Sequence, residues 1–375
     1  MAQPRDINNY FKIAGRILRI GLTLFALVWL LDWALLGYFD RPNLLLRNQT
    51  ASISAMPYLL EDYHDHQGRR VAFLGSSVIA GNLYTLPQEA APYLVERRLR
   101  GEYGMTNLRA FNLAVPGITM GDCYLLLSSL ADDPPDLVVL TINVKFFCSY
   151  VVDAAAIRYS RLWGLARPKE RDCAAARSGF SRRQRFESLL GNSIARRWAM
   201  PRLLPLYNEI IFGRQNPLNT ALAGNVLSAS APDLVEPAGS PDFLRQPDRW
   251  RRLEPGRVDL LRTVYEQIVP VEENSNFFFL EQVLELLGRE QIPAVVYITP
   301  LNSEFNNQSG LLDPTAYEQF KRQIAVMVEG RGIGLLDLSD AVPGQWFGDL
   351  DHLLYPGHRI LAQRLAGPIA AKLTQ

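Results

Sequence analysis

The chain has 375 residues, of which 48% are hydrophobic and 21% charged, and its formal net charge is +1 at pH 7. This is an ordinary globular composition, and a net charge near zero gives no reason to expect a nucleic-acid partner. The three cysteines match no metal-binding spacing and are too few for a disulfide framework, and four histidines make a histidine-rich metal site improbable. We therefore expect no metal and no other cofactor.

An almost wholly apolar stretch covers residues 17–39. A membrane-spanning helix needs about 20 such residues. Four basic residues precede the stretch: Arg5, Lys12, Arg16 and Arg19. The positive-inside rule then places the N-terminus in the cytoplasm and the rest of the chain outside. No small-x-small cleavage site follows, so the sequence predicts a cytoplasmic tail (1–16) and an uncleaved single-pass anchor (17–39).

One charged residue, Asp32, lies inside this apolar stretch. A charge inside hydrocarbon costs about 2.5–3.5 kcal/mol on insertion scales, although a position near the outer end lowers that cost. A buried amphipathic helix of a soluble protein is therefore the alternative interpretation of the segment.

The rest of the chain alternates between two hydrophobic patterns. Short apolar runs bounded by turn residues predict five buried strands, at residues 70–74, 108–113, 136–142, 294–299 and 334–338. Helical patterns follow at residues 87–100, 121–131, 275–289, 315–329 and 355–372. This alternation predicts an α/β fold with a doubly wound parallel sheet, in which functional residues gather past the carboxyl ends of the strands.

One long stretch, residues 151–269, breaks the alternation. Residues 158–202 hold twelve Arg or Lys against three Asp or Glu, and residues 228–255 are rich in Pro, Ser and Ala. We interpret 151–269 as a basic, largely helical insertion that divides one domain into the parts 60–150 and 270–375. The basic residues either contact anionic lipid head groups or an anionic polymer, or form a solvated helix face.

Residues typical of nucleophilic catalysis follow the first and last strands. A Gly-Ser-Ser turn ends the first strand, and Asp349 stands three residues before His352 after the last one. Such an Asp can orient a His that takes the proton of a serine nucleophile. Ser76 competes with Ser77 as the nucleophile, and the spacing to the next glycine favours Ser77. Asp351 competes with Asp349 for the role of the carboxylate that orients His352. Its position directly beside His352, however, suits a solvated surface residue better.

These motifs resemble the SGNH/GDSL hydrolase superfamily. Four segments match its sequence blocks G-D-S-x-x-x-G, N-x-G-x-x-G, G-x-N-D and D-x-x-H in order: 75–81, 112–117, 141–144 and 349–358. The matches are incomplete. Ser76 replaces the acid of the first block, Ala114 replaces a glycine of the second, and only Asn143 survives from the third.

The resemblance implies a flavodoxin-like five-stranded parallel sheet and a role for each matched residue. Ser77 would be the nucleophile, His352 the general base and acid, and Asp349 the residue that orients His352. The N–H groups of Ser77 and Gly117 and the side chain of Asn143 would form the oxyanion hole.

The layout of tail, anchor and SGNH-like domain is similar to that of membrane-anchored proteins of teichoic-acid D-alanylation and alginate O-acetylation. This similarity implies a single-pass protein of a bacterial inner (plasma) membrane whose C-terminal domain is extracytoplasmic. It further implies a serine esterase or O-acyltransferase acting on an acylated cell-surface polysaccharide or lipid, beside a multi-spanning acyltransferase partner. The weakened blocks motivate one alternative: a catalytically inactive SGNH-like binding or assembly protein of a cell-envelope polymer modification system.

Overall fold

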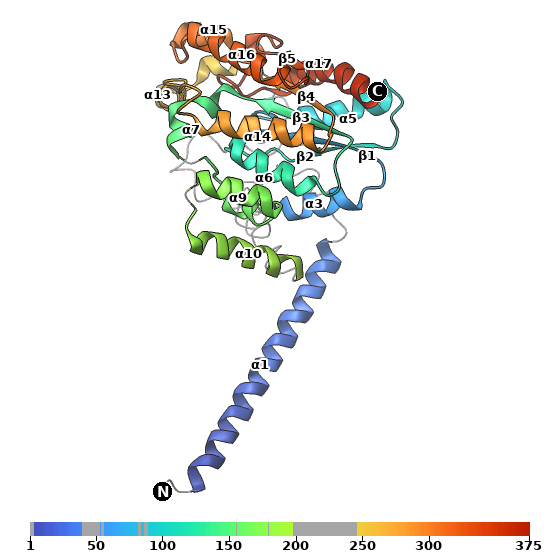
Figure 1. Cartoon of the computed structure of the whole chain (residues 1–375), viewed down its shortest axis with the longest axis vertical. Helices are drawn as coiled ribbons and strands as arrows, with labels where there is room; N and C mark the ends of the chain where they lie inside the picture. The colour runs from blue at the N-terminus through green and yellow to red at the C-terminus, as the bar shows by residue number, and fades with distance from the viewer. Residues whose placement is uncertain are drawn as a thin grey trace.

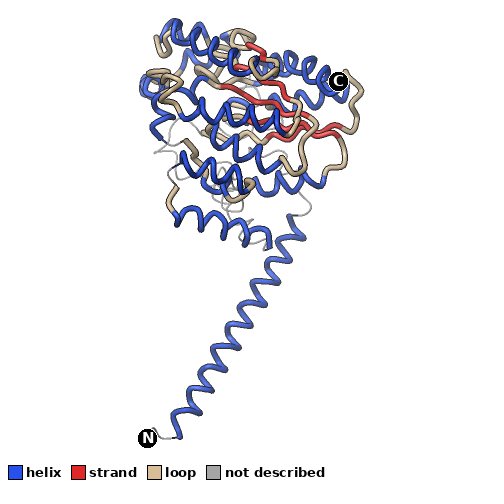
Figure 2. Tube along the Cα trace, viewed as in Figure 1, coloured by secondary structure: helices blue, strands red, loops and turns tan. Residues whose placement is uncertain are grey.

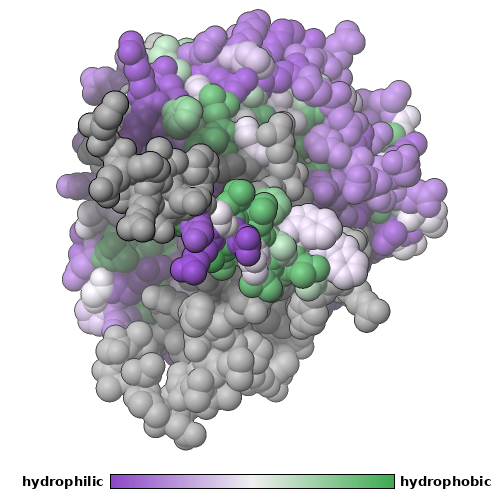
Figure 3. Space-filling model, turned by 90° about the horizontal axis from the view of Figure 1, so that it is seen from below, coloured by the Kyte–Doolittle hydropathy of each residue, from purple (hydrophilic) through white to green (hydrophobic). Residues whose placement is uncertain are grey.

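A single long helix, α1 (Pro4–Phe39), extends from a globular α/β part (Figure 1). This computed structural model describes residues 4–39, 53, 56–81, 84–85, 89–154, 156–178, 180–197 and 246–375. Within α1, the 23 residues Lys12–Ala34 form a segment that is long and apolar enough to cross a membrane. Its apolar part is not buried against the rest of the protein. Seen from the end where α1 lies (Figure 3), apolar residues gather near the centre among hydrophilic ones.

The globular part contains one five-stranded sheet with the strand order β2-β1-β3-β4-β5. Its strands are β1 (Arg69–Leu74), β2 (Leu108–Asn112), β3 (Leu137–Ile142), β4 (Ala294–Ile298) and β5 (Leu335–Asp337). All pairings are parallel, and Ala72 of β1 is in register with Phe111 of β2 on one side and Val138 of β3 on the other. This order is the flavodoxin-like one. The predicted doubly wound parallel sheet is confirmed, and every strand end lies within one residue of its predicted position.

Helices cover both faces of the sheet, as the tube view shows (Figure 2). The larger ones are α5 (Ala91–Gly101), α6 (Met120–Leu130), α14 (Ser275–Arg289), α16 (Pro314–Glu329) and α17 (Tyr355–Leu373). α5 packs against α17, and α6 packs against α14. The chain reverses its direction across the sheet after β2, so right-handed crossovers place these two pairs on opposite faces. Every residue of β3 is buried, as expected for a central strand covered on both faces.

An aromatic cluster joins α14 and α16 to the segment that follows β3. The ring centroid of Phe147 lies 4.5 Å from that of Phe277 and 5.0 Å from that of Phe320. All three side chains are almost fully buried. Buried aromatic pairs at such distances contribute packing and quadrupole interactions in addition to area burial.

The stretch predicted to be an insertion is helical where the structure describes it. It contains α7 (Ser149–Ala154), α8 (Ser160–Trp163), α9 (Pro168–Ser178), α10 (Arg182–Arg197), the 3-10 turn η4 (Arg249–Arg252) and α13 (Pro255–Val264). α8 and α9 pack against α6. Residues 198–245, with most of the stretch rich in Pro, Ser and Ala, lie outside the described residues. The division into domains stays a prediction.

The remaining helical elements are short. They are α3 (Met56–Asp65), α4 (Ser77–Ala80), α15 (Ser303–Ser309) and the 3-10 turns η2 (Val144–Phe147) and η5 (Gly344–Trp346). Of these, α4, η2 and η5 adjoin the segments that carry the predicted site residues.

Truncating one ring of the aromatic cluster tests this packing. We expect Phe277→Ala to lower the free energy of unfolding by about 3–5 kcal/mol, because it opens a cavity in a fully packed core. Urea unfolding of the detergent-solubilised chain, followed by tryptophan fluorescence, measures the change. The matched control is Phe186→Ala on α10, whose side chain is 64% exposed and which should change the free energy by less than about 0.5 kcal/mol. Equal effects of the two variants would contradict the packing described.

Candidate active site

The Gly-Ser-Ser turn carries the chain from β1 into the short helix α4. Gly75 must be a glycine, because a Cβ atom there would lie 2.7 Å from the Cβ atom of Thr141 on β3. Ser76 precedes the helix with extended backbone angles and is buried, whereas Ser77 is the first helical residue and is partly exposed. The first N–H groups of a helix have no carbonyl partner in their own helix. The turn therefore presents the Ser77 hydroxyl, and not that of Ser76, at the carboxyl edge of the sheet.

The Asp/His motif lies in a closed loop between η5 and α17. Phe347 and Leu353 form an antiparallel bridge, and the Gly348 N–H donates to the carbonyl of His352 over 2.8 Å. Inside this loop, Oδ1 of Asp349 accepts hydrogen bonds from the backbone N–H of His352 at 2.9 Å. The backbone of the loop alone therefore holds the Asp349 carboxylate close to His352.

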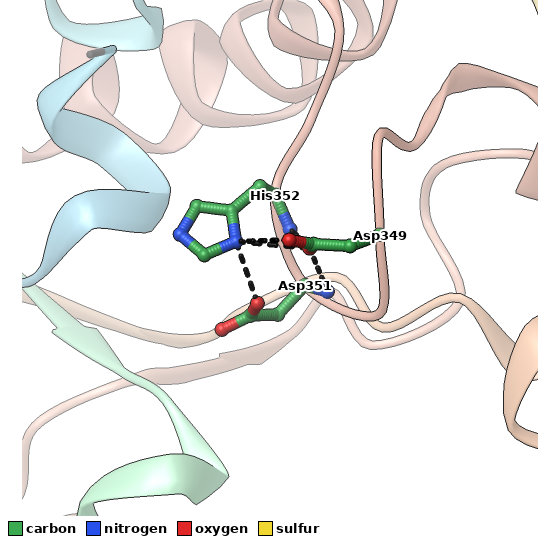
Figure 4. Close-up of side chains that lie close together, drawn as sticks. All are labelled: Asp349, Asp351 and His352. Atoms are coloured by element: carbon green, nitrogen blue, oxygen red, sulfur yellow. Dashed lines mark hydrogen bonds and ion pairs between the residues drawn. The ribbon is translucent and has the colours of Figure 1, made fainter. Parts of the chain in front are cut away.

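The structure brings Ser77, His352 and Asp349 together, although Ser77 and His352 are 275 positions apart in sequence. Ser77 Oγ lies 2.8 Å from His352 Nε2. His352 Nδ1 lies 2.9 Å from Asp349 Oδ1, and Figure 4 shows the opposite ring nitrogen pointing away from the carboxylates. Because Nδ1 faces carboxylates, it carries a proton, and Nε2 is the nitrogen that faces the Ser77 hydroxyl.

Asp351 is buried, so the expectation that it is a solvated surface residue is wrong. It is 1% exposed, and its Oδ1 lies 2.9 Å from His352 Nδ1 (Figure 4). Its other oxygen, Oδ2, accepts a hydrogen bond of 2.8 Å from Nδ2 of Asn143. The closed loop turns the Asp351 side chain inward, against Asn143 at the end of β3. The polarity of the sequence around Asp351 does not reveal this burial. His352 thus faces two carboxylates.

The two carboxylates determine the charge of the imidazole. Burial alone would lower the pKa of His352, but the negative charges of Asp349 and Asp351 outweigh it and raise this pKa to about 9. Burial likewise opposes the ionisation of Asp351, yet the charges of His352 and Lys145 hold the pKa of its carboxyl below the usual value. At neutral pH the resting site therefore contains an imidazolium between two carboxylates.

Two residues outside every motif of the sequence analysis also contact Asp349. The hydroxyl of Tyr84 donates to Asp349 Oδ2 at 3.3 Å, and a guanidinium nitrogen of Arg257 lies 3.6 Å from the same oxygen. The guanidinium of Arg249 lies 5.1 Å from the ring centroid of Tyr84. Burial, followed by the charge of Asp349, raises the pKa of the Tyr84 hydroxyl well above its usual value, so it stays a donor. No motif marks these residues, because their positions depend on how η4 and α13 fold back over the site.

The predicted oxyanion-hole residues follow neighbouring strands. Gly117 comes after β2 and has φ +71°, a conformation that favours glycine, and a Cβ atom there would lie 2.6 Å from a guanidinium nitrogen of Arg158. Asn143 directly follows β3 and is buried. The Val115 N–H donates to the Gly75 carbonyl over 3.0 Å, which ties the β2 loop to the serine turn. The structure thus places both residues at the carboxyl edge of the sheet, and their role stays a prediction.

His358, the second histidine of the last block, has a structural contact. Its Nδ1 accepts a hydrogen bond of 3.3 Å from the backbone N–H of Ala91, at the start of α5. Burial, aided by the charge of His352, lowers the pKa of His358 to about 3, so this ring is neutral. His358 therefore links α17 to α5 and does not join the group around Ser77.

The same loop could also hold a metal ion. Asp349, Asp351 and His352 are all buried, and each offers one ligand atom within 4.8 Å of the others. Carboxylate oxygens and an imidazole nitrogen are suitable ligands for Zn²⁺ and similar ions. A metal here would displace the Nδ1 proton, so metal binding and the hydrogen-bonded arrangement are mutually exclusive.

Comparisons with known proteins add little to this geometry. No protein-family model matches the chain, and no curated protein matches it. Among solved structures, the chain is similar to LAE5, an α/β hydrolase from the Lake Arreo metagenome, with 11% identity, TM-score 0.34, and coverage of 83% of this chain and 98% of that one. A carbohydrate acetylesterase family member from Sinorhizobium meliloti gives 12% identity, TM-score 0.34, and coverage of 82% and 100%.

A third similar structure is a catalytic mutant of Axe2, an acetylxylan esterase from Geobacillus stearothermophilus, with 11% identity, TM-score 0.35, and coverage of 82% and 96%. Likenesses this weak carry no argument about activity or substrate. The case for a function therefore depends on the contacts around Ser77.

The charge state of His352 can be measured directly. In the full chain labelled at its four histidines, we expect the His352 imidazole to lose its proton near pH 9, because two carboxylates stabilise its charged form. His358 should stay neutral above pH 5, since its pKa lies near 3. Imidazole NMR titration, assigned with single His→Gln variants, makes the measurement. A His352 titration near pH 6.5 would refute the paired-carboxylate description, and a His352 signal that changes with added Zn²⁺ would assign the loop to metal binding.

Proposed function

We propose that this protein is a serine esterase or O-acyltransferase that works through an acyl-Ser77 intermediate. The single observation that carries the proposal is the chain of contacts from Ser77 Oγ through the imidazole of His352 to Asp349. A hydroxyl 2.8 Å from one ring nitrogen of a histidine, with a carboxylate on the other nitrogen, is the arrangement of a serine nucleophile and its base.

In the acylation half-reaction, neutral His352 takes the Ser77 hydroxyl proton on Nε2 while Oγ bonds to the carbonyl carbon of an ester. The carbonyl electrons move to the oxygen and give a tetrahedral oxyanion. Collapse of this intermediate breaks the bond to the leaving oxygen, which receives the proton from His352 Nε2. In the second half-reaction, water or a sugar hydroxyl gives its proton to Nε2 and bonds to the acyl carbon. Collapse of the second tetrahedral intermediate breaks the bond to Ser77 Oγ, which receives the proton from Nε2. Hydrolysis and transfer differ only in this acceptor.

In the proposal, the N–H groups of Ser77 and Gly117 and the side chain of Asn143 donate to the oxyanion. Removing one such donor typically costs about 100-fold or more in rate. Asp349 stabilises the imidazolium that forms in each half-reaction, and Tyr84 and Arg257 hold its second oxygen. These assignments are supported by the positions of the residues at the carboxyl ends of β1, β2 and β3 and in the loop before α17.

The raised pKa of His352 sets the pH dependence of this reaction. Below pH 9 the imidazole is mostly protonated, and a protonated ring cannot accept the serine proton. The rate constant kcat/KM, which reports the free enzyme, should therefore rise with pH and level off above about 9.

The cellular setting belongs to the same proposal. We infer that α1 anchors the protein in a bacterial inner membrane as a single pass, with the catalytic domain outside the cytoplasm. The length and apolar composition of α1 support this inference. The substrate would then be an acylated polysaccharide or lipid of the cell surface, and a multi-spanning acyltransferase would be the partner.

One observation favours the alternative of a non-catalytic binding or assembly protein. Two carboxylates on one imidazole keep His352 charged at neutral pH, which withholds the general base under those conditions. In that case the SGNH-like pocket would bind an acylated polymer without cleaving it.

A fluorophosphonate probe distinguishes the two functions. We expect the full chain to be labelled on Ser77, more than about tenfold faster at pH 9 than at pH 7, because the neutral fraction of His352 increases. Ser77→Ala should abolish labelling, whereas the neighbouring control Ser76→Ala should retain it, since the Ser76 hydroxyl is buried and has no hydrogen-bond partner among the described residues. Gel fluorescence and peptide mass spectrometry give the readout. A folded chain that is unlabelled at pH 9 would favour the non-catalytic function.

A further inference from the structure

The two oxygens of Asp351 contact two different parts of the candidate site. Oδ1 lies 2.9 Å from Nδ1 of His352, and Oδ2 accepts the hydrogen bond from Nδ2 of Asn143 at 2.8 Å. His352 is the residue that would move the proton, and Asn143 is the residue whose amide would meet the oxyanion. One buried carboxylate thus joins two groups that come from opposite ends of the sequence.

The amide of Asn143 is fixed in orientation by its partners. Its Oδ1 accepts a hydrogen bond of 2.9 Å from the backbone N–H of Lys145, and one of its two N–H groups is bound to Asp351. An amide offers two N–H donors. These contacts determine which side of the amide carries nitrogen, and they leave a single N–H for another acceptor.

We propose that Asp351 is a positioning residue that couples the two halves of the catalytic machinery, holding the imidazole of His352 through an ion pair and the amide of Asn143 through a hydrogen bond. This inference rests on the proposed function and adds a residue to it. Asp349 accepts hydrogen bonds from the His352 ring and from the backbone N–H groups of Asp351 and His352, whereas Asp351 is the carboxylate that accepts from the Asn143 amide. The two carboxylates therefore have different roles: Asp349 orients the base, and Asp351 fixes the base relative to the oxyanion donor.

The charge of Asp351 acts on His352 within a group of other polar side chains. Those that contact or electrostatically influence this pair are Asp349, Tyr84, Arg257, Arg249, Lys145, Tyr265, Cys148, His358 and Ser77. Tyr265 is fully buried, and burial, followed by the charge of Asp351, raises the pKa of its hydroxyl. Cys148 is buried as well, and burial raises the pKa of its thiol. Both groups stay neutral, so Asp351 and Asp349 are the anions that set the charge of His352.

The variant Asp351→Asn keeps the shape of the side chain and removes its charge. We expect the pKa of His352, measured by imidazole NMR, to fall by about one to three pH units, because an opposite charge in contact with the ring is lost. The rising limb of the pH–rate profile should move to lower pH with it. At the plateau, kcat should fall about 10- to 100-fold with little change in KM, since the oxyanion donor loses its fixed position.

The matched control is Asp337→Asn, which removes a carboxylate that pairs with Lys321 at 3.2 Å instead of with His352. It should leave the pKa of His352 and kcat unchanged. If Asp351→Asn does not fold, Asn143→Ala provides the second test: Asp351 loses its amide donor, so the pKa of His352 should rise. The NMR readout needs no activity, so it tests Asp351 even if the protein is not an enzyme. An unchanged pKa of His352 in the folded variant, or a change equal to that of the control, would overturn the proposal.

A second inference concerns the helix α10, which presents an unusual outer face. Its inner face is held to the globular part: Ser188 Oγ donates to the Ser160 carbonyl at 2.7 Å, and Asn192 Nδ2 donates to the Arg161 carbonyl at 3.0 Å. The opposite side carries three exposed apolar side chains, two arginines and one glutamate, which pairs with Arg183 at 2.6 Å: Phe186, Leu189, Leu190, Arg182, Arg183 and Glu187. Apolar and basic residues on one exposed face are typical of a helix that lies at a membrane surface.

The position of α10 in the molecule indicates that its outer face points toward the membrane. Along the long axis of the molecule, α10 lies at the end of the globular part from which α1 extends (Figure 1). Residues 40–55 connect α1 to α3 and can span at most about 55 Å. The globular part therefore stays close to any bilayer that contains α1.

We infer that the outer face of α10 rests on the surface of the bilayer that α1 enters, with the apolar side chains at the acyl boundary and the arginines at anionic head groups. The contact would hold the globular part in a fixed orientation above the membrane. It rests on the proposed anchor, but not on the chemistry of Ser77.

A polarity-sensitive fluorophore tests this contact in the full chain, reconstituted in nanodiscs that contain phosphatidylglycerol. A label on Leu190→Cys should be blue-shifted, quenched by doxyl lipids and protected from aqueous iodide. The control label on Val326→Cys, at a side chain on α16 that is 74% exposed, should behave in the opposite way. Replacing Arg182 and Arg183 with Glu should release the Leu190 label. Iodide quenching equal to that of the control, or protection from iodide without quenching by doxyl lipids, would overturn the inference.

Discussion

The contact between Ser77 Oγ and His352 Nε2 depends on the whole architecture of the globular part. The two residues are 275 positions apart and 2.8 Å from each other. The parallel sheet makes this possible, because the carboxyl ends of all its strands lie at one edge. Because β1 lies between β2 and β3 in the sheet, the serine turn that follows β1 lies next to the loops that carry Gly117 and Asn143. Any change that shifted β1 against β3, such as a side chain at Gly75, would also move the serine away from its histidine.

Electrostatics imposes the second constraint. A buried imidazole would ordinarily be neutral, but two carboxylates in contact with one ring nitrogen reverse this preference and favour the charged form. In the proposed reaction, the same carboxylates would stabilise the imidazolium that forms when His352 takes the serine proton. They would also lower the fraction of neutral base in the resting state, so the proposed activity would increase toward alkaline pH.

Much of this fold could be predicted from the sequence, because it depends on local periodicity. The apolar runs of β1 to β5 and the capped pattern of α14 are independent of distant residues. The contacts of Asp351, Tyr84 and Arg257 could not be predicted in the same way. Asp351 is buried only because the loop 347–353 closes on itself, and Arg257 reaches Asp349 only because α13 returns to the site after a long stretch without a recognisable pattern. Motifs identified which residues meet, whereas the environment that sets their charge is a tertiary property.

The central claim is that an acyl group passes through Ser77 under the control of His352. Mass spectrometry of the full chain, quenched during turnover of an activated acyl ester at pH 9, tests it most directly. The account predicts that the acyl group is found on the peptide containing Ser77, and that Asp349→Asn lowers the rate of its formation at pH 9, because the imidazole loses the carboxylate that orients it. Turnover of the ester with no acyl group on Ser77, or equal acylation in His352→Ala, would contradict it.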